Sequence, residues 1–166
     1  MTYLITFAGY GWRLHGDEKG AIDRWQNGFG HPFIAVDRRR VAVQERTMDQ
    51  GRYVMDEVRR SVVLKALCDR CVKWDWMLWA AHVRSNHAHV VVGGERRPEK
   101  ILIDLKAFAS SRLREMGLDG VERKKWARHG STRWLWKAAD VEAAIRYVVH
   151  GQGEGMAVFE RERCRK

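Results

Sequence analysis

The sequence contains little cysteine and little proline, and it has no long apolar run. The chain of 166 residues holds three cysteines and two prolines, and three cysteines do not make a disulfide framework. No apolar run approaches the ~20 residues that a membrane helix needs. The first residues also lack the basic leader and cleavage site of a secretory signal. These absences predict a cytoplasmic protein with no membrane partner.

Two of the cysteines have the spacing of a metal-binding knuckle. Cys68 and Cys71 are separated by two residues, but no second pair is present to complete a set of four ligands. Both also fall inside a helical pattern. We therefore interpret them as ordinary buried or half-buried thiols.

Basic residues are in clear excess over acidic ones. Lys and Arg number 31 against 21 acids, which gives a formal charge of +10. Such an excess attracts polyanions, of which nucleic acid is the commonest, although a generally basic surface is the plainer alternative. The length suits one domain over residues 1–166, with a long functional loop at about 9–50 and a short basic C-terminal tail.

Eight tryptophans are many for a chain of this length. Some must lie in the core, because aromatic rings bury large areas. Trp12 and Trp134 stand beside basic residues, and such a neighbourhood also suits stacking on unpaired bases. For any one tryptophan taken alone, a core position is the better interpretation.

Hydrophobic periodicity predicts an alternation of strands and helices. Strands are expected over residues 3–7, 76–83, 87–92 and 130–137, and helices over residues 58–74, 98–116 and 141–149. Ser85 and Asn86 form a hairpin turn, Pro98 begins the middle helix, Gly117 caps its end, and Asp140 caps the last helix. This order predicts an α+β fold, with an antiparallel sheet that carries its helices on one face and leaves the other open.

Two histidines stand two residues apart in the strand that follows the hairpin turn. Because successive strand side chains point to opposite faces, His87 and His89 emerge on the same face. Two neutral imidazoles side by side can bind one divalent metal. Alternatively, they are two polar residues on the wet face of a half-buried strand.

A tyrosine on the last helix is the candidate nucleophile. Tyr147 lies about a right angle from the centre of the apolar stripe, at the edge of the core face. A phenol has an unperturbed pKa of about 10 and needs a metal at the phosphate to become useful against it. Its attack on DNA would release a 3′ oxygen and leave a 5′-phosphotyrosine. A boundary tyrosine that only packs its ring is the plainer alternative.

Four segments in order resemble the single-tyrosine HUH transposases, and in particular the REP-associated tyrosine transposases. The sequence Asn-His-Ala-His at 86–89 is similar to their metal motif, and residues 146–153 resemble their nucleophile helix. Residues 11–17 and 128–136 are also similar to segments of that family. The resemblance implies a ferredoxin-like (RRM-like) HUH endonuclease domain that cuts single-stranded DNA near a hairpin with Mg²⁺ or Mn²⁺. It makes His87 and His89 metal ligands and Tyr147 the nucleophile.

The third metal ligand departs from the family pattern. Relatives commonly place Gln or Asn one helical turn after the tyrosine, where this chain has Gly151. We expect Gln152 to be the ligand, because the surrounding glycines can bend the chain inward. His150 is the alternative, and a water can also complete the shell.

Further residues are candidates for DNA contact because they flank the metal motif or stand in basic and aromatic segments. Hydrogen bonding within the hairpin turn is an equally good explanation for Arg84 and Asn86, and solvent exposure is the default for Lys106 and Arg112. For the early loop, the alternative is a loop packed down by its own tryptophan. The full set of candidates is Trp12, Arg13, His15, Arg84, Asn86, Lys106, Arg112, Arg133, Trp134 and Lys137.

Three functions are compatible with these residues. The leading hypothesis is a metal-dependent endonuclease and strand transferase for single-stranded or hairpin DNA. The second is a non-catalytic module that binds single-stranded nucleic acid on an open sheet. The third is a phosphodiester hydrolase that uses water in place of tyrosine. The sequence does not decide whether the protein is a monomer or a homodimer, and it does not reveal which DNA site the protein recognises.

Overall fold

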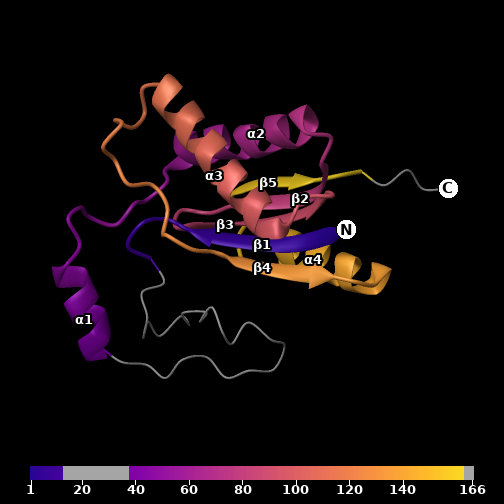
Figure 1. The fold of residues 1–166 in the computed structure, drawn as a ribbon, viewed down its shortest axis with the longest axis horizontal. Helices are drawn as coiled ribbons and strands as arrows, with labels where there is room; N and C mark the ends of the chain where they lie inside the picture. The colour runs from indigo at the N-terminus through magenta and orange to yellow at the C-terminus, as the bar shows by residue number, and fades with distance from the viewer. Residues whose placement is uncertain (13–37, 163–166) are drawn as a thin grey trace.

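The computed structural model describes residues 1–12 and 38–162 (Figure 1). Strands and helices follow one another in the order β1 (Thr2–Ala8), α1 (Arg38–Arg46), α2 (Glu57–Lys73), β2 (Met77–Val83), β3 (His87–Gly93), α3 (Pro98–Glu115), β4 (Ser131–Leu135), α4 (Ala138–His150) and β5 (Ala157–Glu160). The predicted strands and helices are all present. In addition, α1 lies within the long early loop and β5 follows the glycine-rich segment. Both are short, and no clear periodicity marked them.

The five strands form one antiparallel sheet in the order β4-β1-β3-β2-β5. The predicted hairpin joins β2 to β3, and the amide of Arg84 donates to the carbonyl of His87 at 2.8 Å across the two-residue turn. That short turn fixes the register of the hairpin. The α+β fold with an antiparallel sheet is confirmed.

Helices α2 and α3 cover one face of the sheet. Alternate residues of β1 (Tyr3, Ile5, Phe7) point into this layer, as do Ala88, Val90 and Val92 of β3. These side chains pack with the apolar stripes of the two helices and form the larger core. In Figure 1 the two helices lie on the same side of the strands.

Helix α4 packs on the opposite face of the sheet, which Figure 1 also shows. Ala144, Ile145 and Val148 of this helix contact Val91 and Leu135 in a second, smaller core. The prediction that all helices lie on one face and leave the other open is therefore wrong. The physical reason is present in β3, whose apolar residues run continuously from position 90 to 92 and so need cover on both faces.

The helix ends follow from local chemistry. Asp56 caps α2 by accepting the amide of Arg59 at 2.8 Å, and Pro98 begins α3 as predicted. Gly117 has φ of 68° and follows α3 in a Schellman-type end. Asp140 does not cap α4. It lies inside the first turn, where its carboxylate accepts the Lys137 amide at 3.3 Å.

No helix in the described part of the chain combines the length and the apolarity that a bilayer crossing requires.

Candidate metal and nucleophile site

The two histidines of β3 lie side by side on the sheet face that α4 covers. The ring centroids of His87 and His89 are 4.8 Å apart, with planes at 83° to each other. His89 is buried, His87 is half-buried, and the Nε2 atoms of both rings are buried. The shared face is confirmed, but it is not the open face that the sequence led us to expect.

Hydrogen bonds at Nδ1 orient both imidazoles. The Oδ1 atom of Asn86 lies 2.6 Å from Nδ1 of His87, and Oγ1 of Thr6 lies 2.7 Å from Nδ1 of His89. An amide oxygen only accepts, so Nδ1 of His87 carries the proton and its lone pair resides on Nε2. This arrangement is the one that metal-ligating histidines require, because the second nitrogen is fixed by an outer partner.

A third histidine, His82, lies on the same face, directly opposite His89 in the β2–β3 ladder. Its Nδ1 donates to the carbonyl of Val148 at 3.0 Å, and its Nε2 accepts the amide of Met156 at 3.2 Å. Burial lowers the pKa of His82 and so favours the neutral ring that these two bonds need. The residue ties the end of α4 to the start of β5.

Sequence reasoning missed the role of His82, although its position could have been found. A two-residue turn at Ser85 and Asn86 pairs position 84 with 87, and hence position 82 with 89. The partner of His89 on the other side, Thr6, carried no such signal, since it depends on the pairing of two strands far apart in the sequence.

Tyr147 lies next to His89, on the surface of α4. Its ring centroid is 5.6 Å from that of His89, and the residue is 46% exposed. Ala144, Ile145 and Val148 are buried beside it, which confirms that Tyr147 stands at the edge of the apolar stripe. The phenol is therefore both adjacent to the histidine pair and open to a large ligand.

Gly151 leaves room for the tyrosine ring. A Cβ atom at this position would lie 2.8 Å from the carbonyl oxygen of Tyr147 and 3.0 Å from its Cδ2. Such a contact would force the ring or the helix end to move. The glycine that replaces the expected ligand is thus also what allows the observed position of Tyr147.

The third ligand stays a prediction. Within residues 1–12 and 38–162, no group of three His, Cys, Asp or Glu side chains is placed to hold a metal ion. Gln152 follows α4 and is half-buried, whereas His150 is the exposed last residue of that helix. The residues present fit a divalent metal in part, since His87 and His89 supply two oriented imidazoles on one face.

Three of the other predicted contact residues engage the protein itself. Trp12 donates from Nε1 to the carbonyl of Tyr53 at 2.7 Å, and Arg84 donates to the carbonyl of Glu154 at 2.9 Å. Arg112 is exposed and pairs with Glu115 at 2.7 Å. Of the remaining candidates, Arg133, Trp134 and Lys137 lie in or just after β4, while Arg13 and His15 lie outside the described residues.

Lys106 is buried, so the prediction that it is exposed is wrong. Its ammonium group donates to the carbonyls of Ala127 and His129 at 2.8 and 2.9 Å, and it lies 6.0 Å from the ring centroid of Phe7. Burial lowers the pKa of Lys106 to about 8. Its hydrogen bonds hold the segment between α3 and β4 against α3.

The cysteines behave as ordinary thiols, as predicted. Cys68 is half-buried and Cys71 is buried, and both are free. Burial raises the pKa of Cys71 to about 12, so it carries no thiolate near neutral pH.

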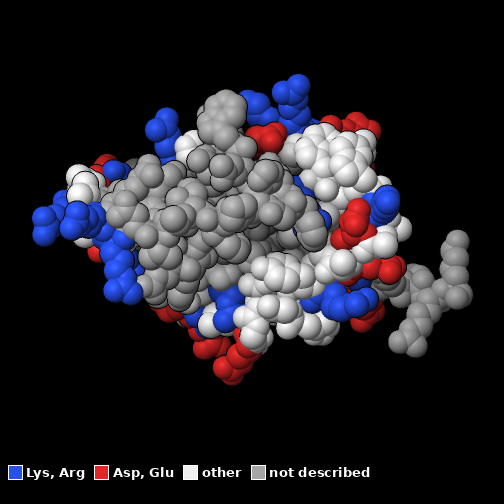
Figure 2. Space-filling view, turned by 90° about the horizontal axis from the view of Figure 1, so that it is seen from below, with Lys and Arg blue, Asp and Glu red and all other residues white. Residues whose placement is uncertain are grey.

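Basic side chains lie around much of the surface. Figure 2 shows Lys and Arg at the end of the molecule where α1 lies and along the borders of this view, with acidic side chains between them. On the described part of the face in this view, basic side chains therefore lie at several separate places and do not form one patch.

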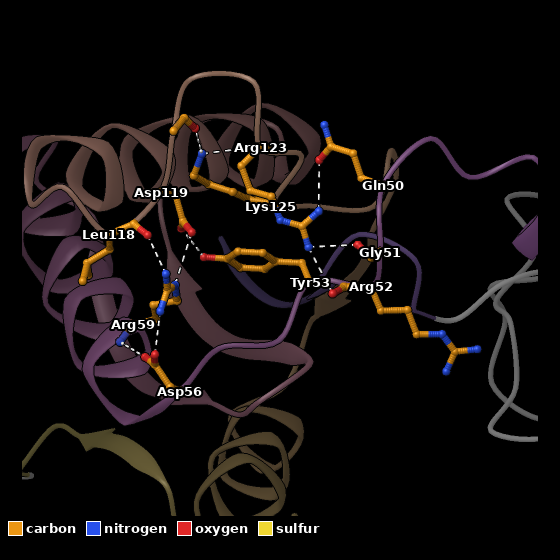
Figure 3. A network of polar contacts seen from close by, with 11 residues as sticks. Gln50, Gly51, Arg52, Tyr53, Asp56, Arg59, Leu118, Asp119, Arg123 and Lys125 are labelled. Atoms are coloured by element: carbon orange, nitrogen blue, oxygen red, sulfur yellow. Dashed lines mark hydrogen bonds and ion pairs between the residues drawn. The ribbon is translucent and has the colours of Figure 1, made fainter.

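A separate polar network anchors the segment before α2 (Figure 3). The hydroxyl of Tyr53 donates to Asp119 at 2.5 Å, and Arg59 approaches the same carboxylate at 3.2 Å. Arg123 donates to the carbonyls of Gly51 and Arg52 at 2.9 and 3.0 Å. Burial raises the pKa of Tyr53, whose ring is inaccessible, so this network fastens chain segments together and offers no reactive group.

No protein-family model matches the chain, and no curated protein matches it in sequence. Among solved structures, it is similar to a REP-associated tyrosine transposase bound to a REP hairpin, with 10% identity and a TM-score of 0.48. The match covers 90% of this chain and 65% of that one, so the chain spans less than two thirds of the other protein's length. With a likeness at this level, the activity has to be argued from the residues.

Proposed function

We propose that the protein is a metal-dependent endonuclease and strand transferase that acts on single-stranded or hairpin DNA. The observation that carries the proposal is the row of three adjacent rings: His87 contacts His89, and His89 contacts Tyr147 at 5.6 Å between centroids. Two histidines of β3 and an exposed phenol of α4 are thereby brought to one place.

His87 and His89 would hold the metal through Nε2, with Gln152, or alternatively His150, as the third ligand. Mg²⁺ or Mn²⁺ bound there would neutralise charge on the scissile phosphate. Asn86 and Thr6 orient the two rings, and the net positive charge of the chain would favour the approach of the DNA backbone.

Tyr147 would act as the nucleophile. Its phenolic oxygen attacks phosphorus, the new oxygen–phosphorus bond forms as the bond to the 3′ oxygen breaks, and the phenolic proton leaves to solvent. The 3′ oxygen departs with a proton and a 5′-phosphotyrosine ester remains. Attack on that ester by another 3′ hydroxyl reverses the chemistry, so strands can be joined without a further cofactor.

The two competing functions predict different products. A non-catalytic module would bind DNA without cutting it, and the sheet offers less to such a module than expected because α4 covers its second face. A hydrolase that uses water would cut DNA without becoming attached to it.

The test is to incubate the protein with labelled hairpin and single-stranded DNA plus Mn²⁺ and to look for an SDS-stable adduct. We expect an adduct that Tyr147→Phe and His87→Ala abolish, and that Tyr10→Phe, a hydroxyl removed elsewhere, preserves. Cleavage that survives Tyr147→Phe would point to hydrolysis. Binding without any cleavage would point to the module.

A further inference from the structure

A row of aromatic rings lies at the end of the sheet that is farthest from the histidines. It consists of Trp74, Trp76, Tyr3, Trp134 and Trp136, and we call it the aromatic row. Trp134 and Trp136 are stacked with centroids 5.1 Å apart and planes at 11°, and Trp74 and Trp76 are stacked at 6.1 Å and 20°. Three of these four tryptophans are exposed, and two stacked pairs so close together need an explanation.

Tyr3 joins the two pairs. Its ring meets Trp134 edge-on at 4.9 Å, and its hydroxyl donates to the carbonyl of Gly94 at 3.5 Å. A Cβ atom added to Gly94 would lie 3.0 Å from Cδ1 of Trp76, so the second pair adjoins that glycine. The two stacked pairs are therefore neighbours that are linked through Tyr3 and the backbone of Gly94.

The outer members of the row face solvent. Trp136 is 68% exposed, and Trp134 and Trp74 are each 39% exposed, whereas Tyr3 and Trp76 are buried beneath them. Indole is costly to leave in water, and exposed apolar surface of this kind marks a binding site more often than chance. Of the buried members, Tyr3 meets Trp134 edge-on and Trp76 stacks on Trp74.

Basic side chains accompany the exposed rings. The guanidinium of Arg96 lies 4.1 Å from the ring centroid of Trp74, and Lys137 follows Trp136 directly. Guanidinium planes stack on bases as aromatic rings do, and they also pair with phosphate. Asp75 and Glu95 adjoin these residues in the sequence, so the local excess of positive charge is small and stacking has to supply most of the affinity.

We propose that the aromatic row is a stacking platform for unpaired bases of single-stranded nucleic acid. Flat rings, stacked and flanked by guanidinium and ammonium groups, are the chemistry that binds unpaired bases without regard to sequence. The proposal does not depend on the chemistry proposed for Tyr147. The row lies at the Gly93 end of β3, about 20 Å along the strand from His87, so it would hold a part of the strand remote from the scissile phosphate.

The test measures the binding of a labelled oligothymidylate of about 12 nucleotides by fluorescence anisotropy, in EDTA so that no cleavage occurs. We expect Trp136→Ala and Trp74→Ala each to weaken binding by about five- to a hundredfold, at every salt concentration. Trp136→Phe should retain most of the affinity. Met116→Ala, which removes an exposed apolar side chain at the end of α3, should leave it unchanged.

An abasic oligonucleotide of the same length separates stacking from charge, since it keeps the phosphates and lacks the bases. The platform requires that the wild type bind it much more weakly than oligothymidylate and that Trp136→Ala reduce the difference between the two. Equal binding of the two oligonucleotides by the wild type would overturn the proposal. So would a dimer that Trp136→Ala dissociates without loss of oligothymidylate affinity, because the row would then be a contact between copies of the chain.

Discussion

At the scale of single residues, the histidine pair depends on side chains that would not themselves touch a metal. Asn86 and Thr6 are hydrogen-bonded to Nδ1 of His87 and of His89, respectively. Both ring nitrogens of His82 are hydrogen-bonded to backbone groups, one at the end of α4 and one just before β5. Each of these contacts turns an imidazole or a backbone segment to a set orientation. The consequences are measurable at individual positions.

Replacement of Asn86 by alanine should weaken metal binding. The side chain fixes the proton of His87 on Nδ1, and loss of such an outer partner typically lowers metal affinity 10- to 100-fold. Calorimetric titration with Mn²⁺ measures the effect. Ser85→Ala, in the same turn, is the matched control and should bind Mn²⁺ as the wild type does. Equal affinity for the Asn86→Ala variant would exclude His87 as a ligand held in this way.

Lys106 should make the stability of the protein depend on pH. Burial lowers its pKa from 10.5 to about 8, so between these values the unfolded chain binds the proton more readily than the folded one. Stability from this residue is therefore lowest below pH 8 and rises as the pH is raised toward 10.5, by up to about 3 kcal/mol.

Urea unfolding at several pH values checks this expectation. The difference in unfolding free energy between wild type and Lys106→Met should shift in favour of the wild type from pH 8 to 10. Comparison of the two proteins cancels the other groups that titrate there. A difference that does not vary with pH would mean that the ammonium is better solvated than its burial indicates.

At the scale of elements, the end of α4 decides where the candidate nucleophile lies. Gly151 follows the helix directly beneath the ring of Tyr147, and the glycine-rich segment then leads to Met156, whose amide bonds His82. The segment after the helix is thus fixed at its start by the contact of Gly151 with Tyr147 and at its end by the hydrogen bond of Met156 to His82. A side chain at position 151 would compete with the tyrosine for space.

Gly151→Ala should move Tyr147 and reduce adduct formation at least tenfold while the fold is kept. The added Cβ atom would lie 2.8 and 3.0 Å from atoms of Tyr147. Gly155→Ala is the matched control, because its Cβ atom would meet nothing closer than Cγ2 of Val158 at 4.0 Å. Adduct yield and circular dichroism measure the two effects. Full activity of Gly151→Ala would mean that the ring position seen here is not the reactive one.

Several elements could be predicted because local chemistry marks them. Ser85 and Asn86 predict the hairpin turn, and Pro98 and Gly117 predict the two ends of α3. Tyr147 lies at the edge of the apolar stripe of its helix, as the hydrophobic periodicity predicts. Other features depend on partners distant in the sequence. On a helical wheel Lys106 lies off the apolar stripe, and the wheel does not show the carbonyls of residues 127 and 129 that allow its burial. The continuous apolar run of β3 indicates that both faces of the sheet are covered. The interpretation of β3 as an amphipathic strand overlooked this sign that a helix lies on the second face.

At the scale of the whole molecule, the sheet separates two cores of unequal size. Helices α2 and α3 share the larger one, while α4 rests on a small set of apolar side chains. Less apolar area has to be exposed to lift α4 from the sheet than to unfold the other layer. The element that carries the candidate nucleophile is therefore more easily released than α2 or α3.

Hydrogen exchange should reveal this difference in stability. Amides of α4 should exchange through a partial opening of lower free energy than those of β1 and β3, whose exchange should require global unfolding. Exchange measured at increasing low denaturant concentrations, with mass spectrometric readout, distinguishes the two. Equal protection of α4 and β3 would indicate that the two layers unfold together.

The position of β1 also has a consequence for how the chain is made. Its neighbours in the sheet, β3 and β4, come at residues 87–93 and 131–135, so the first strand emerges from the ribosome long before either partner. At 5–20 residues per second the delay before β3 is complete is roughly 4 to 17 s. During that time the backbone N–H and C=O groups on both edges of this apolar strand are unpaired, and the strand has to be kept from pairing with other nascent chains.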